Sequence, residues 1–88
     1  MILQVFAIRD LKMEFRQPFF AFSSASVIRE LTKTLKSQSD DSLVTNPEDF
    51  QLFKVGEFDT TQGKFLNVES TFILNVNDLK ESTEMNKA

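Results

Sequence analysis

The chain begins with an apolar stretch that decides how the rest of the sequence can be arranged, Met1-Ile2-Leu3-Gln4-Val5-Phe6-Ala7-Ile8. These residues favour a β-strand, because β-branched and aromatic side chains are frequent among them. Successive side chains of a strand point to opposite faces of its sheet. Ile2, Phe6 and Ile8 then share one face, and Leu3, Val5 and Ala7 share the other. Both faces are apolar, which predicts a central strand.

A short strand and a helix are predicted next, after a polar connection over residues 9–17. Residues 18–22 favour a strand that starts at Pro18, where a missing N–H is tolerated. Ser23 or Ser24 can cap a helix over residues 25–36. An apolar stripe along that helix is predicted to pack on the sheet, and it consists of Val27, Ile28, Leu31 and Leu35.

The second half of the chain favours strands. Residues 50–58, 64–68 and 71–76 are predicted to form a three-stranded meander, with a bulge near Gly56 and a hairpin loop over residues 59–63. Residues 77–88 are charged and are expected to be a flexible tail behind a single domain of residues 1–76. The predicted fold class is α+β, an antiparallel sheet of four to five strands with one helix packed on one face.

Composition limits the chemistry. The 88 residues include ten Phe but no Cys and no His, so thiolate ligands, thiol nucleophiles and the usual neutral-pH base are absent. Carboxylate pairs such as Asp40 and Asp41 fall in predicted turns, where acids serve as caps. We therefore expect no enzyme activity, no cofactor and no metal site. The first residues carry no basic leader and no apolar run is long enough for a membrane span, so we expect an intracellular protein that makes no membrane contact.

A set of short motifs points to a known family. The motifs are Asn46-Pro47-Glu48-Asp49-Phe50-Gln51-Leu52-Phe53, Gly56-Glu57-Phe58-Asp59, Gly63-Lys64-Phe65 and, upstream, Pro18-Phe19-Phe20. Over roughly residues 1–76 the chain resembles the small nonstructural protein of gokushoviruses, which are single-stranded DNA phages of the microvirus group. The resemblance implies a protein of the host bacterial cytoplasm that is absent from the mature virion and supports single-stranded genome synthesis or packaging. It supplies no catalytic residue, and Phe53, Phe58 and Phe65 are expected in the core.

Single-stranded DNA binding is the first of two functional hypotheses. It requires cations along the phosphates and aromatic rings on which bases stack. The residues that offer both are Arg9, Lys12, Phe15, Arg16, Phe19, Phe20, Arg29, Lys33 and Lys36. The net charge of −3 argues against this hypothesis, although residues 1–38 hold six basic residues against three acidic ones. Core packing of the Phe residues and a solvated helix face are the structural alternatives.

A protein-interaction module is the second hypothesis. A single helix shields only one face of the sheet, so apolar residues on the other face need a different cover. A homo-oligomer, with a dimer favoured, is the simplest cover, and the module would dock on a viral replication initiation protein or a host replication protein. The two hypotheses are compatible. The sequence favours a non-catalytic phage replication or packaging factor.

Overall fold

The computed structural model describes the backbone of residues 1–85 and the side chains of residues 1–80. It consists of β1 (Ile2–Asp10), β2 (Phe19–Ala21), α1 (Ser24–Lys36), α2 (Ser42–Thr45), the 3₁₀ turn η1 (Pro47–Asp49), β3 (Phe50–Asp59), β4 (Lys64–Leu66), β5 (Thr71–Asn75) and α3 (Val76–Met85). The five strands form one antiparallel sheet. The predicted α+β class is therefore confirmed.

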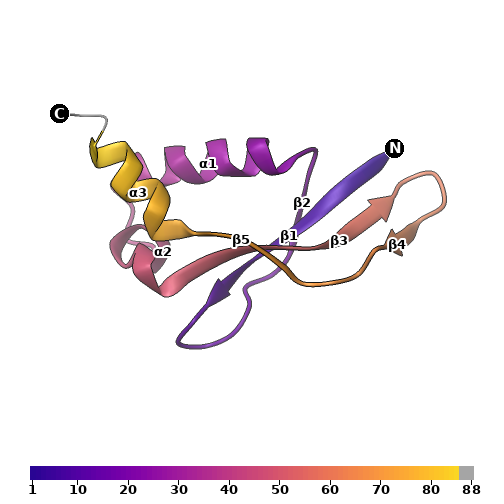
Figure 1. Cartoon of the computed structure of the whole chain (residues 1–88), viewed down its shortest axis with the longest axis horizontal. Coiled ribbons are helices and arrows are strands. Elements are labelled where there is room, and N and C mark those ends of the chain that lie inside the picture. Colours follow the sequence, from indigo (N-terminus) through magenta and orange to yellow (C-terminus); the bar gives the residue numbers. More distant parts are fainter. Residues whose placement is uncertain (86–88) are drawn as a thin grey trace.

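Strand β1 lies inside the sheet, as the two apolar faces of residues 1–8 predicted. It pairs with β2 along one edge and with β3 along the other. The predicted meander is wrong, because β4 and β5 do not pair with each other. Both pair with the same edge of β3, β4 near Phe58 and β5 near Phe53 (Figure 1). The ten-residue β3 is long enough for both, since β4 has three residues and β5 has five.

The predicted bulge lies where β1 meets β3. Val5 pairs with Gly56 but Phe6 pairs with Lys54, so Val55 is the extra residue. Gly56 has a φ of +157°, a backbone conformation that residues with a side chain rarely adopt. A Cβ at this position would lie 3.4 Å from the carbonyl oxygen of Leu66. Glycine is therefore required at the bend of β3. The hairpin loop before β4 also forms as predicted, with Gly63 at a φ of +68°.

Helix α1 begins as its sequence predicts. The Oγ of Ser23 accepts a hydrogen bond from the backbone N–H of Ser26, so Ser23 is the N-cap. The buried stripe of α1 packs against residues of β1 and β3 on one face of the sheet, and α2 adds Leu43 to the same core. The buried core consists of Phe6, Ile8, Val27, Leu31, Leu35, Leu43, Phe50, Leu52 and Val76.

Helix α3 occupies most of the segment expected to be a flexible tail. Val76 is fully buried and Leu79 packs against the core, which places α3 beside α1 and η1 (Figure 1). Two apolar residues three positions apart give this helix a side to bury, and the surrounding charged residues hide that pattern in the sequence. The folded unit therefore extends beyond residue 76, while residues 86–88 of the predicted tail lie outside the described residues. No described helix is long and apolar enough to cross a membrane.

Candidate binding surface

The face of the sheet opposite α1 carries six Phe side chains, and we call it the aromatic face. Strand alternation places them there, because paired residues of neighbouring strands point to the same side. Phe53 pairs with Ala7 and Phe72, and Phe58 pairs with Leu3 and Phe65. The six residues are Phe15, Phe20, Phe53, Phe58, Phe65 and Phe72.

Three of these rings, Phe15, Phe53 and Phe72, form a group at one end of the aromatic face, which we call the Phe53 group. The ring centroid of Phe53 lies 5.2 Å from that of Phe15 and 5.8 Å from that of Phe72, at interplanar angles of 74° and 75°. Both contacts have the edge-to-face geometry that aromatic rings favour. Phe15 reaches the face from the β1–β2 loop, where its backbone forms an isolated bridge with Arg9. The group therefore joins a loop, β3 and β5.

The other three rings form the Phe58 group. The ring centroid of Phe58 lies 5.0 Å from that of Phe65 and 5.7 Å from that of Phe20, and Phe20 stacks on Phe65 at 6.4 Å. Phe58 pairs with Leu3 of β1 and Phe53 pairs with Ala7. Since Leu3 and Ala7 are four residues apart, the two groups lie roughly 13 Å apart along the strand. The face thus presents two separate aromatic surfaces.

The rings cover the middle of β1 and remain open to solvent themselves. Val5 and Ala7 point to the aromatic face, yet each is only 4% exposed. Four rings are exposed by 41% to 58%, namely Phe15, Phe20, Phe65 and Phe72. With about 200 Å² for a complete Phe side chain, these four leave roughly 400 Å² in water. The total matches the area of the largest apolar patches of monomeric proteins, which are frequently functional, but here it is divided between the Phe53 group and the Phe58 group.

The expectation that Phe53, Phe58 and Phe65 lie in the core is wrong. Phe53 and Phe58 are half-buried, Phe65 is 58% exposed, and all three lie on the aromatic face. The reason is alternation within β3, whose Phe50 and Leu52 point to the helices while Phe53 points away. The rings of Phe53, Phe58, Phe65 and Phe72 on this face are missing from the site predicted by sequence. The alternation of residues 50–58 contains the signal that separates Phe53 from the core residues Phe50 and Leu52.

Charge is distributed unevenly between the two faces. The acidic residues of the strands, Asp10, Glu57 and Asp59, alternate to the helix side. Arg9 alternates to the aromatic face and is exposed, and among the described side chains it has no ion-pair partner. The aromatic face therefore has one cation and no acid at its strand positions.

The predicted nucleic-acid residues do not form one surface. Arg9, Phe15 and Phe20 belong to the aromatic face, but Phe19 points to the core, where it stacks on Phe6 at 6.1 Å. The exposed cations of α1, Arg29, Lys33 and Lys36, lie on the side of the helix away from its buried stripe. The sheet separates them from the aromatic rings.

The two loop cations of the predicted set are engaged in ion pairs. The Nζ of Lys12 lies 3.3 Å from a carboxylate oxygen of Asp49. The guanidinium of Arg16 donates to Asp41 at 2.9 Å and lies 4.8 Å from the ring centroid of Phe50. Asp41 also accepts the N–H of Leu43 and thereby caps α2. The hydrogen bond from Arg16, followed by that from Leu43, holds the pKa of Asp41 below its usual value. These contacts attach the β1–β2 loop to α2 and η1.

Two acidic residues near the hairpin loop, Glu57 and Asp59, have structural partners. Asp59 accepts the N–H of Thr61 in the hairpin loop, and Glu57 accepts a hydrogen bond from the side chain of Asn67, which lowers the pKa of Glu57. Within the described residues, no group of three or more potential ligands is arranged to hold a metal ion.

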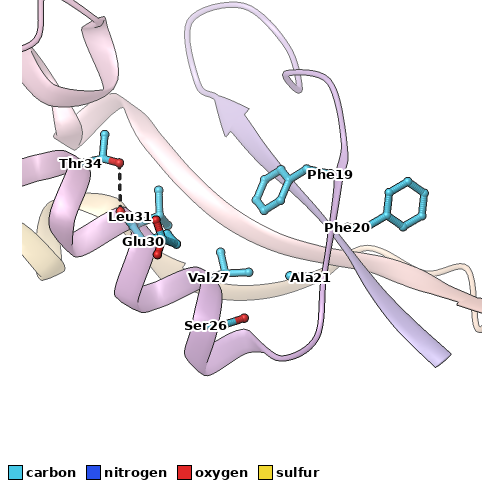
Figure 2. Close-up of a pocket in the computed structure, with 8 residues that line it drawn as sticks. All are labelled: Phe19, Phe20, Ala21, Ser26, Val27, Glu30, Leu31 and Thr34. Carbon is cyan, nitrogen blue, oxygen red and sulfur yellow. Dashed lines mark hydrogen bonds between the residues drawn. The ribbon is translucent and has the colours of Figure 1, made fainter. Parts of the chain in front are cut away.

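A second apolar feature is a groove of about 230 Å³ between β2 and α1. Figure 2 shows Phe19 and Ala21 of β2 facing Val27 and Leu31 of α1 across it. At its end the Oγ1 of Thr34 donates to the backbone oxygen of Glu30. The groove is lined mainly by apolar side chains and contains no group of reactive side chains.

The fold and the aromatic face define a class, a small α+β protein with exposed aromatic side chains on the face of its sheet that no helix covers. The family model described as Phage ORF5 protein matches residues 3–79. The chain belongs to this family and is a phage protein. A search of curated proteins and a search of solved structures find no match to this chain.

Proposed function

We propose that this protein is a non-catalytic gokushovirus nonstructural protein that supports single-stranded DNA synthesis or packaging by stacking bases on the aromatic face. The observation that carries the proposal is the set of six Phe rings on a sheet face without strand acids. Aromatic rings on an open sheet are a recurrent way to bind unpaired bases. The proposal places the protein in the host bacterial cytoplasm and outside the mature virion.

The geometry supports single strands in preference to duplex DNA. Stacking needs the face of a base, which a duplex covers with its neighbouring base pairs. Each stacked base contributes about 1–3 kcal/mol, and every base has a π-face, so we expect little sequence preference. The exposed rings on each side of the roughly 13 Å gap provide stacking positions for more than one base.

Fluorescence anisotropy with a labelled oligothymidine tests the proposal. Phe65→Ala removes the most exposed ring of the Phe58 group, and the dissociation constant should rise about 5-fold to 150-fold, as expected for one lost stacking contact. Leu66→Ala is the matched control, because Leu66 is the next residue of β4 and points to the opposite face. The absence of binding by the natural sequence at low salt, or an equal effect of both variants, would exclude base stacking on this face.

A second candidate function is an interaction module that docks on a viral or host replication protein without touching DNA. The scarcity of free cations favours it, since Arg9 alone of the face's strand residues is available for phosphates. Pull-down of purified phage replication initiation protein, with Phe65→Ala and Leu66→Ala compared, tests this alternative. This alternative requires two results: the replication protein binds the natural sequence but not Phe65→Ala, and the natural sequence binds no oligonucleotide.

A further inference from the structure

We propose that a second copy of this chain covers the aromatic face when no DNA is bound, and that single-stranded DNA displaces this copy. The displacement step rests on the proposed function, whereas the dimer does not. The two copies would stack face to face as a sandwich of two sheets, whose typical separation is about 10 Å.

The size of the aromatic face fits a small dimer interface. The ten residues of β3 span roughly 33 Å, and four strand positions across the sheet span roughly 19 Å, so the face covers about 600 Å². A standard interface uses about 800 Å² per partner. The roughly 400 Å² of exposed ring surface in each copy would supply the apolar contacts in two areas, the Phe53 group and the Phe58 group.

The charge of the face favours a second copy over a charged partner. In a two-fold dimer both copies use the same patch, so several acids on the face would bring like charges close together across the interface. The strand acids Asp10, Glu57 and Asp59 all point to the other side. Arg9 lies beside the last residue of β1, where its guanidinium can reach the rim of the interface. Repulsion between the net negative charges of the two copies is weakened by salt.

Competition follows from the geometry. The rings that would stack on bases, such as Phe65 and Phe72, are the same rings that would be buried between two copies. A face that is occupied by a second copy cannot also hold a strand of DNA. Binding of DNA would therefore require the dimer to separate, and the apparent affinity for DNA would fall as the protein concentration rises.

The test uses the full chain in size-exclusion chromatography with light scattering, at protein concentrations up to about 100 µM. We expect twice the chain mass of 10.1 kDa for the natural sequence. Phe65→Lys and Leu66→Lys add the same charge at neighbouring positions on opposite faces, and we expect Phe65→Lys to be monomeric and Leu66→Lys to remain dimeric. Circular dichroism establishes that each variant is folded. A monomeric natural sequence, or two folded variants with the same mass, overturns the dimer.

Oligonucleotide addition to the natural sequence tests the displacement and needs no variant. A saturating amount of an oligothymidine of about eight nucleotides should yield complexes with one chain per strand. A complex that retains the face-to-face dimer, seen as unchanged association in the presence of bound DNA, overturns the competition. If no oligonucleotide binds at low salt, the proposed DNA function and the displacement both fail, and the dimer is still decided by the comparison of Phe65→Lys with Leu66→Lys.

Discussion

The salt dependence of oligonucleotide binding distinguishes an aromatic surface from a cationic one. For single strands, the logarithm of the binding constant falls with the logarithm of salt concentration with a slope of about −0.7 for each neutralised phosphate. Arg9 is the free cation of the aromatic face, while Lys12 and Arg16 are held by Asp49 and Asp41. One or two phosphate contacts give a slope of about −0.7 to −1.4.

The expected loss of affinity is correspondingly small. Between about 50 and 200 mM salt, a slope of −0.7 to −1.4 raises the dissociation constant roughly 3-fold to 7-fold. If all six cations of the predicted site contacted phosphates together, the slope would be about −4 and the loss roughly 300-fold. The structure places Arg29, Lys33 and Lys36 beyond the sheet, so we expect the smaller value.

Anisotropy titrations at several salt concentrations measure this slope. Arg9→Ala should make it shallower by about 0.7, because one phosphate contact is lost. Arg29→Ala is the control, since it removes the same charge from the outer side of α1 and should leave the slope unchanged. A slope near −4, or an effect of Arg29→Ala equal to that of Arg9→Ala, would refute the assignment of binding to the aromatic face.

Three further predictions concern stability in urea unfolding. Gly56→Ala should lower the free energy of unfolding by about 1–3 kcal/mol because of its φ of +157°, whereas Gly63→Asn should be nearly neutral, since Asn tolerates a φ near +68°; equal losses would contradict this. Asp41→Asn keeps the cap of α2 but loses the ion pair with Arg16, so we expect a loss of about 0.5–1 kcal/mol at neutral pH. The pKa of Asp41 in the folded protein lies below the reference value of 3.8, so the stabilisation by its ion pair is present above pH 3.8 and disappears as the pH falls through the folded pKa. Over this acidic range, the free energy of unfolding should therefore fall less steeply in Asp41→Asn than in the natural sequence. Leu79→Ala should cost about 1–2 kcal/mol through lost burial in the core, and no measurable change would indicate that α3 does not contribute to stability.

The sequence predicts the local features of this fold well. The cap at Ser23, the bulge at Gly56 and the loop at Gly63 depend on neighbouring residues, and all three are confirmed. The central position of β1 follows from apolar residues on both of its faces, which α1 and the aromatic rings cover. These features need no knowledge of distant segments.

Two errors in the fold arise where distant segments decide. Whether β5 pairs with β4 or with β3 depends on the length of free edge that β3 offers, which local patterns do not encode. The helical state of α3 depends on the space beside α1 and η1, into which Val76 and Leu79 pack. Tertiary contacts thus override the charged composition of residues 77–85.

Contacts between distant segments also decide which of the predicted site residues share one surface. Arg9, Phe15 and Phe20 share the aromatic face, although Phe20 belongs to a different group from Phe15. The pairing of Arg16 with Asp41 links segments 25 residues apart, and neither segment alone predicts it. A single site that includes the α1 cations requires the edge of α1 to adjoin the β1–β2 loop. The structure places the outer side of α1 and the aromatic face on opposite sides of the sheet.

The pairing of β1 with β3 has a consequence for synthesis on the ribosome. Asp10 pairs with Phe50 and Ile2 pairs with Asp59, so β1 must wait for about 50 further residues before its main partner exists. At about 5–20 residues per second, that delay lasts roughly 3–10 s. During this time the nascent chain can offer β1 only the three-residue β2 as a neighbour. Completion of the sheet is therefore a late event of translation, and chains that terminate before residue 50 leave the apolar start of the protein without its central partner.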